Sequence, residues 1–216
     1  MPAVPITPKG RRTMQRILAA ARLVLARTGY VTMRMSDVAD EAGLSLGALY
    51  RYFDNKEDMF ESLVGDTHED LFRASAGGDH DFATAPYEAL YAGNRGYLEH
   101  YHENRDVLRV LMEVMTVDKR FRDIWWEMRQ RHIKRFVTAL DHGHQMAGLS
   151  EREATRRCEA LCSLVEMSAY AWFAQDELND QPPSLEEATK TVTDVWFAAF
   201  FDLVKMSSER QRSAAT

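Results

Sequence analysis

The chain has 216 residues, of which 45% are hydrophobic and 28% are charged, and its formal net charge at pH 7 is −6. These values fit a folded protein with a sizeable core. They exclude a membrane-spanning protein, because no apolar run approaches the roughly 18 residues that a span needs. A signal peptide is not expected either, because the N-terminal segment MPAVPITPKGRR lacks an apolar core. We therefore expect a cytoplasmic protein.

Nearly every segment has helical periodicity, and none shows strand-like alternation. The predicted helices cover residues 7–28, 36–42, 46–53, 56–74, 86–103, 105–115, 119–145, 151–177 and 185–205. Gly29 predicts a left-handed cap after the first helix. Capping boxes at Ser150–Glu153 and Ser184–Glu187 predict where the last two begin. The sequence therefore predicts an all-α protein of about nine helices, with three short ones at the front and a bundle behind.

The second and third predicted helices form a characteristic pair. A tight turn at Gly43 and Leu44 joins them, and Val38 and Leu49 are apolar at the spacing that locks two helices together. This arrangement is typical of a helix-turn-helix, in which the second helix enters the major groove of DNA. We therefore expect residues 1–55 to be a DNA-binding domain and residues 56–216 to be a helical domain of another role.

The exposed face of the second of these helices has the residue types that contact DNA. Small residues at Gly47 and Ala48 let the backbone approach base edges, and Leu46 can contact a thymine methyl. Tyrosine hydroxyls and a lysine can reach phosphates, and the amides at a helix N-terminus can donate to one. The DNA contacts predicted from this segment are Ser45, Leu46, Gly47, Ala48, Tyr50, Arg51, Tyr52 and Lys56.

The local charge supports the same interpretation. Residues 1–64 hold nine basic and seven acidic side chains, a net charge of +2, so the rest of the chain carries −8. A less acidic N-terminal part suits contact with phosphates. Two interpretations of Lys9, Arg11 and Arg12 remain open: a solvated tail, or an arm that reaches the adjacent minor groove.

Residues 10–64 resemble the DNA-binding domain of the TetR family of transcriptional regulators. The matching residues are Gly29, Tyr30, Asp37, Val38, Ala39, Ala42, Gly43, Leu44, Ser45, Gly47, Ala48, Leu49, Tyr50, Arg51, Tyr52, Phe53, Lys56 and Glu57. One position departs from the family, which usually has Thr just before the second helix, where this chain has Arg34. The helix cap is then lost or passed to Ser36, and Arg34 becomes a further predicted DNA contact.

The resemblance implies a homodimeric repressor that leaves a palindromic operator in double-stranded DNA when a small hydrophobic effector binds the C-terminal bundle. An activator, or a regulator without an effector, remains the alternative. Bulky adaptable side chains suit an apolar pocket, and the predicted ligand contacts are Met112, Met115, Trp125, Met128, Met167 and Trp172.

Dimerisation through the last two helices is expected because each has an apolar stripe. These stripes comprise Leu161, Leu164, Val165 and Trp172, then Val192, Val195, Trp196, Ala199, Phe200 and Leu203. An intramolecular core is the alternative for both stripes.

Neither catalysis nor a cofactor is expected, because the sequence has no nucleophile elbow, phosphate-binding loop, dinucleotide fingerprint or zinc-protease motif. No metal site is expected, because His100 and His102 are two apart and lie on different faces of a helix. Cys158 and Cys162 share a helix face, as two buried small side chains or, alternatively, as a redox switch.

Overall fold

The computed structural model describes residues 7–143, 145, 149–175 and 179–202. Its helices are α1 (Pro8–Thr32), α2 (Met35–Glu41), α3 (Leu46–Leu49), α4 (Lys56–Ala74), α5 (Pro86–Glu103), α6 (Arg105–Val114), α7 (Lys119–His142), α8 (Glu151–Phe173) and α9 (Leu185–Phe197), followed by a π-helix (Ala198–Asp202). These described residues contain no strand, so the all-α prediction is confirmed. No helix among them is long and apolar enough to cross a membrane.

The chain forms two compact units. The N-terminal unit comprises Met1–Glu69 and Asn104–Asp123, and the C-terminal unit comprises Asp70–Glu103 and Ile124–Thr216. Helices α4 and α7 contribute residues to both units. The N-terminal unit is therefore not a continuous stretch of sequence, because α6 and the first turn of α7 belong to it.

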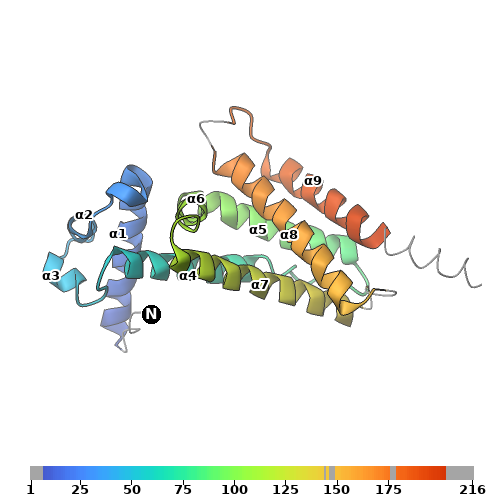
Figure 1. The fold of residues 1–216 in the computed structure, drawn as a ribbon, viewed down its shortest axis with the longest axis horizontal. Helices are drawn as coiled ribbons and strands as arrows, with labels where there is room; N and C mark the ends of the chain where they lie inside the picture. Colours follow the sequence, from blue (N-terminus) through green and yellow to red (C-terminus); the bar gives the residue numbers. More distant parts are fainter. Residues whose placement is uncertain (1–6, 144, 146–148, 176–178, 203–216) are drawn as a thin grey trace, which may run out of the picture. The chain divides into compact units, whose positions relative to one another are not determined.

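The N-terminal unit is built on α1, which contacts both α2 and α6 (Figure 1). The apolar face of α1 is buried, as its periodicity predicted. The fully buried side chains of this unit include Ile17, Val24, Leu25, Val38, Leu49, Phe53, Met59, Phe60 and Phe121. Tyr30 covers the aromatic part of this core, because its ring centroid lies 4.9 Å from that of Phe60, which lies 5.1 Å from that of Phe121.

Local signals placed most helix ends correctly. The Thr7 hydroxyl accepts a hydrogen bond from the Gly10 amide at the start of α1, and Gly29 adopts a positive φ of +72° near its end. A few residues continue the helix as far as Thr32 beyond this kink. Both predicted capping boxes, at Ser150 with Glu153 and at Ser184 with Glu187, are present with their reciprocal hydrogen bonds.

Several predicted helices were too long, including the eighth, because α8 ends at Phe173 rather than at residue 177. Helix α3 ends at Leu49 rather than at residue 53, because Tyr52 and Phe53 both donate backbone hydrogen bonds to the Leu49 carbonyl and close a turn. That turn buries Phe53 and places Asn55 at the start of α4. Helix α7 ends at His142, and α9 gives way to the π-helix at Ala198, while residues 203–205 of the ninth predicted helix lie outside the described part.

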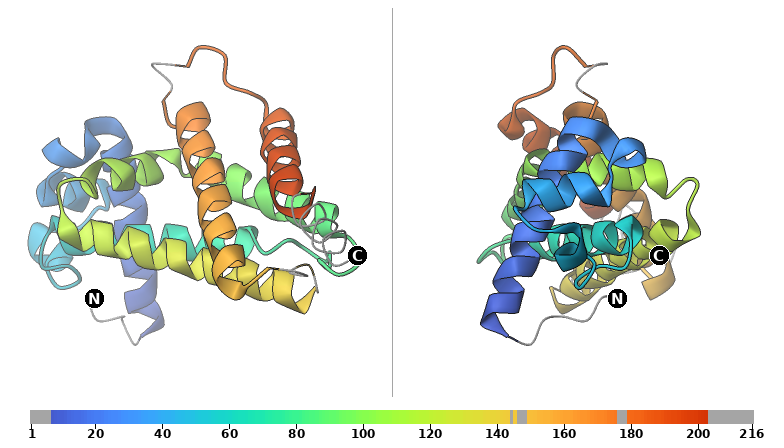
Figure 2. Two further views of the ribbon diagram at one scale, coloured as in Figure 1. Left: turned by 45° about the vertical axis from the view of Figure 1, so that its right-hand side comes forward. Right: turned by 90° about the vertical axis from the view of Figure 1, so that its left-hand side faces the viewer.

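In the C-terminal unit, α5 contacts both α8 and α9, and α8 and α9 run antiparallel beside each other (Figure 2). The core of this unit includes Leu90, Leu98, Ile133, Leu140, Ala169, Val192, Trp196 and Phe200. Two polar side chains in this core are buried and pair with each other. The Asn94 amide of α5 donates a 3.0 Å hydrogen bond to the Thr193 hydroxyl of α9. A buried polar pair of this kind is tolerated because each group satisfies the other.

Candidate nucleic-acid interface

The turn between α2 and α3 is fixed by backbone hydrogen bonds. The Gly43 amide donates to the Asp40 carbonyl at 3.0 Å, and the Leu44 amide donates to the Ala39 carbonyl at 2.9 Å. Gly43 has a φ of +62°, a conformation that side chains with a Cβ rarely adopt. The turn therefore requires this glycine, and it sets the direction in which α3 leaves.

Helix α3 is a single turn that depends on its cap. The Ser45 hydroxyl oxygen accepts a 3.2 Å hydrogen bond from the Ala48 amide, and Leu49 is fully buried beneath the turn. The cap satisfies an amide that the short helix cannot satisfy itself. Ser45 remains exposed, so its hydroxyl hydrogen is still available to donate to a phosphate.

The outer surface of α3 exposes most of the predicted contacts together. Leu46 is 41% exposed and Tyr50 is 47% exposed, while Gly47 and Arg51 are also exposed. Ala48 and Tyr52 are half-buried. A Cβ added at Gly47 would meet no atom within 4 Å, so the backbone there is open to an approaching partner. This surface combines apolar, phenolic and cationic groups, which can contact base edges and phosphates together.

Arg34 occupies the N-cap of α2 and makes no side-chain cap there. The cap has not passed to Ser36, because its hydroxyl donates to the Asp37 carboxylate instead. Arg34 is exposed, as a DNA contact must be. Because the family's threonine is replaced by Arg34, α2 has no side-chain cap. One amide in its first turn therefore lacks the hydrogen bond that a threonine would accept.

Lys56 is more constrained than the other predicted contacts. Its ammonium donates a 2.9 Å hydrogen bond to the Tyr30 carbonyl and lies 4.4 Å from the centroid of the Tyr30 ring. An ammonium has three donors, so these contacts leave capacity for a phosphate. They also hold the start of α4 against the end of α1.

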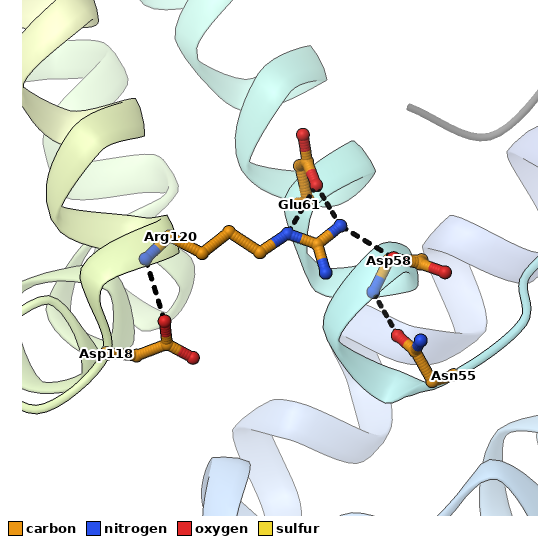
Figure 3. Close-up of polar contacts among 5 residues, drawn as sticks. All are labelled: Asn55, Asp58, Glu61, Asp118 and Arg120. Atoms are coloured by element: carbon orange, nitrogen blue, oxygen red, sulfur yellow. Dashed lines mark hydrogen bonds and ion pairs between the residues drawn. The ribbon is translucent and has the colours of Figure 1, made fainter.

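An ion cluster fixes the start of α4 within the N-terminal unit (Figure 3). The Asn55 side chain accepts a 2.7 Å hydrogen bond from the Asp58 amide. Arg120 donates to the Glu61 carboxylate from Nε at 2.7 Å and to the Asp58 carboxylate at 2.6 Å. Hydrogen bonds with Asp58 and Glu61 raise the pKa of Arg120 above its usual value, although burial opposes this. The start of α7 is thereby tied to α4, the helix that follows the α3 turn.

The basic residues near the N-terminus lie in a helix. Lys9, Arg11 and Arg12 are exposed in the first turns of α1. Both interpretations of these residues, a solvated segment or an arm that reaches the minor groove, therefore stay open.

The predicted ligand contacts divide between the two units. Met112 and Met115 belong to the N-terminal unit, whereas Trp125, Met128, Met167 and Trp172 belong to the C-terminal unit. Met167 is 52% exposed, and Trp125, Met128 and Trp172 are half-buried. Sequence reasoning missed Arg129 and Glu166, which contact Trp125 or each other, and the neighbouring pair Tyr97 and Tyr101 on α5. Their one sequence signal was the four-residue spacing of Tyr97 and Tyr101, which places both on one face of a helix.

The predicted dimerisation stripe on the last helix needs correction. Val192, Trp196 and Phe200 are fully buried within the chain itself, as are most atoms of Leu161 and Val165 on α8. The intramolecular alternative holds for these residues, because α5 covers α9. Val195 remains exposed, Leu164, Trp172 and Ala199 are half-buried, and Leu203 lies outside the described residues.

Cys158 is buried and Cys162 is half-buried, and both are free thiols. Burial is the main cause that raises the pKa of Cys158 to about 12 and that of Cys162 to about 12. A thiol with such a pKa is almost entirely protonated near neutral pH, and the thiolate is the reactive form. Within the described residues, no group of three or more His, Cys, Asp or Glu side chains could hold a metal ion.

Comparison with known proteins found a family that is similar to part of the N-terminal unit. The family described as bacterial regulatory proteins, tetR family, matches residues 17–63. The chain is 31% identical over 114 residues to the uncharacterised HTH-type transcriptional regulator YfiR of Bacillus subtilis, a match that covers 52% of each chain. It is 29% identical over 149 residues to the HTH-type transcriptional repressor KstR2 of Mycolicibacterium smegmatis, which covers 61% of this chain and 69% of KstR2. The chain thus spans about half the length of YfiR and over two thirds of KstR2.

Solved structures extend the similarity of fold to nearly the whole chain. A tetR-family transcriptional regulator from Streptomyces coelicolor matches with a TM-score of 0.71 and 17% identity, over 92% of this chain and 87% of the other. At this identity the match establishes the fold.

Proposed function

This chain belongs to the TetR family of transcriptional regulators, and from that premise we propose that it is a homodimeric repressor released from a palindromic operator by a small hydrophobic ligand. The observation that carries the proposal is the outer surface of α3. Leu46 and Gly47 on α3, and Tyr50 and Arg51 directly after it, are exposed. The Ser45 cap and the buried Leu49 hold this segment in place. Since it acts on the chromosome, we place it in the cytoplasm.

A dimer would put one α3 into each of two successive major grooves. The two recognition helices would then lie about 34–36 Å apart, or a multiple of that distance, on a two-fold symmetric site. A ligand that prefers the DNA-incompetent state would lower operator affinity. A coupling free energy of about 1–3 kcal/mol corresponds to a change of about 5- to 150-fold. The name of the relative KstR2 supports repression.

Operator binding can be measured by fluorescence anisotropy with DNA from just upstream of the protein's own gene. A scrambled duplex of the same composition is the comparison, and each titration is repeated at several salt concentrations. We expect preference for the native duplex and a steep loss of affinity with added salt, because binding releases counterions from the phosphates.

A matched pair of substitutions tests whether α3 is the contact surface. Gly47→Glu should lower operator affinity at least about tenfold, because it sets a bulky carboxylate against base edges and phosphates. Gly65→Glu is the control, because Gly65 is also exposed in the N-terminal unit and a Cβ there also meets nothing within 4 Å. Equal DNA binding by the two variants would contradict the proposal.

A further inference from the structure

A cluster of polar side chains lies within the C-terminal unit. Helix α5 contributes Tyr97 and Tyr101, α7 contributes Trp125 and Arg129, and α8 contributes Glu166. The ring centroids of Tyr97 and Tyr101 are 6.0 Å apart, and the Arg129 guanidinium lies 5.7 Å from the centroid of the Trp125 ring. Tyr101 is buried and the other four side chains are half-buried, so their polar groups need hydrogen-bond partners.

The charged members of this cluster satisfy one another. One Glu166 oxygen accepts a 2.6 Å hydrogen bond from the Trp125 indole, and the other accepts a 2.8 Å hydrogen bond from Arg129. Arg129 also donates to the Glu159 carbonyl at 2.6 Å. The pair carries no net charge, and its hydrogen bonds fix it in place. An ionised ligand would therefore find no unpaired opposite charge here to compensate for its lost hydration.

Tyr101 differs from the other members. It is 2% exposed, and its hydroxyl has no hydrogen-bond partner among the residues that the structure describes. Burial is the largest cause that raises the pKa of Tyr101, with the Glu166 charge as the next, so the hydroxyl stays protonated and able to donate. A buried hydroxyl without a partner costs free energy that a bound oxygen atom would recover.

An aromatic ring lies next to Tyr101, and the Glu166 carboxylate whose charge acts on its hydroxyl is paired with Arg129. That ring belongs to Tyr97, and the ring centroid of His132 is 6.1 Å from that of Tyr97. Burial is also the main cause that raises the pKa of Tyr97 well above its usual value, so this hydroxyl stays protonated as well. The chemistry that fits is apolar, with one group that can exchange a hydrogen bond with a phenol.

We propose that the Tyr101 hydroxyl anchors the effector, and that the effector is an uncharged, largely apolar molecule with one hydrogen-bonding oxygen, such as an alcohol, a phenol or a ketone. This inference rests on the ligand response in the proposed function and narrows the class of ligand. The inference predicts that neutral molecules bind, whereas fatty acids and cationic amphiphiles of the same chain length, which differ from them in charge, bind more weakly.

The test of ligand class is a titration of the full chain, without DNA, followed by tryptophan fluorescence. The indole of Trp125 is hydrogen-bonded within the cluster, so a ligand there should change its emission. The probes are n-decanol, decanoate and decyltrimethylammonium. We expect saturable binding of n-decanol and at least about tenfold weaker binding of both ions. Decanoate or decyltrimethylammonium binding as tightly as n-decanol, or no binding by any probe, would overturn the inference.

Two tyrosine variants on α5 test the anchor. Tyr101→Phe should weaken n-decanol binding about tenfold while thermal stability stays the same or rises, because the hydroxyl has no partner to lose. Tyr87→Phe is the matched control, because its hydroxyl donates a 2.7 Å hydrogen bond to Asp194, away from the cluster. Tyr87→Phe should lose stability and keep its affinity for n-decanol.

The two proposals fail in different ways. Unchanged n-decanol affinity in Tyr101→Phe would overturn the anchor, even if the wild-type protein were a ligand-responsive repressor. A variant that loses stability and keeps its affinity would show instead that the hydroxyl has a partner within the protein, and would also overturn it. Failure of the wild-type protein to bind its operator would count against the proposed function and leave the fluorescence result readable.

Discussion

Ser45 has one observed role and one predicted role: it caps α3, and we expect it to contact DNA. Its side-chain oxygen accepts the Ala48 amide at the start of α3. Ser45→Ala should lower the free energy of unfolding by about 1 kcal/mol, because the cap is lost. Ser45→Asp should keep the cap and the stability, and should weaken operator binding because a carboxylate then faces the phosphates.

Urea unfolding and anisotropy measured on the same two variants distinguish the roles. Stability should fall only in Ser45→Ala, whereas affinity should fall in both and further in Ser45→Asp. If Ser45→Asp bound the operator as tightly as wild type, Ser45 would be a cap that lies away from the DNA backbone.

At the scale of helices, the sequence predicted what local interactions decide. The capping boxes at Ser150 and Ser184 and the glycine at position 29 act within one turn of chain, so the helix ends they mark could be found without tertiary information. The end of α3 could not, because it depends on burying Phe53 against the rest of the N-terminal unit.

The apolar stripe of α9 shows a second limit. Its periodicity correctly predicted a buried face, but a stripe does not identify its partner, and α5 of the same chain covers it. Tyr101 shows a third limit, because nothing local distinguishes a tyrosine whose hydroxyl lacks a partner from any other tyrosine in a helix. The α3 contact surface was predicted in more detail because its spacing repeats a family pattern.

The α5–α9 contact leads to a prediction about pairing. Thr193→Val should destabilise the protein by about 1–3 kcal/mol, because the buried Asn94 amide loses its only described partner. The double variant Asn94→Leu with Thr193→Val should recover much of that loss, since both polar groups are then removed. Thr193→Ser keeps the hydroxyl and serves as the control. Urea unfolding gives the three values, and equal losses in the single and double variants would contradict the pairing.

At the scale of the whole molecule, the distribution of charge bears on DNA binding, and the exposed apolar side chains bear on dimerisation. Residues 1–64 carry a net charge of +2 and the rest of the chain carries −8, so the acidic charge is concentrated outside the segment predicted to bind DNA. Of the apolar residues on the last two helices, Met167 on α8 and Val195 on α9 remain 52% and 44% exposed. A dimer through these helices would cover them, whereas scattered exposure alone would need no explanation.

Introducing charge at these two exposed apolar positions should therefore prevent dimerisation without unfolding the protein. The double variant Met167→Glu with Val195→Glu should sediment as a monomer at concentrations where the wild-type protein sediments as a dimer. Its affinity for a palindromic operator should fall at least about tenfold, because one half-site is then bound at a time, while affinity for a single half-site should be unchanged. Val117→Glu is the control, because Val117 is an exposed valine of the N-terminal unit. A double variant that still sediments as a dimer would show that other residues form the interface, because two carboxylates buried there without partners would not be tolerated.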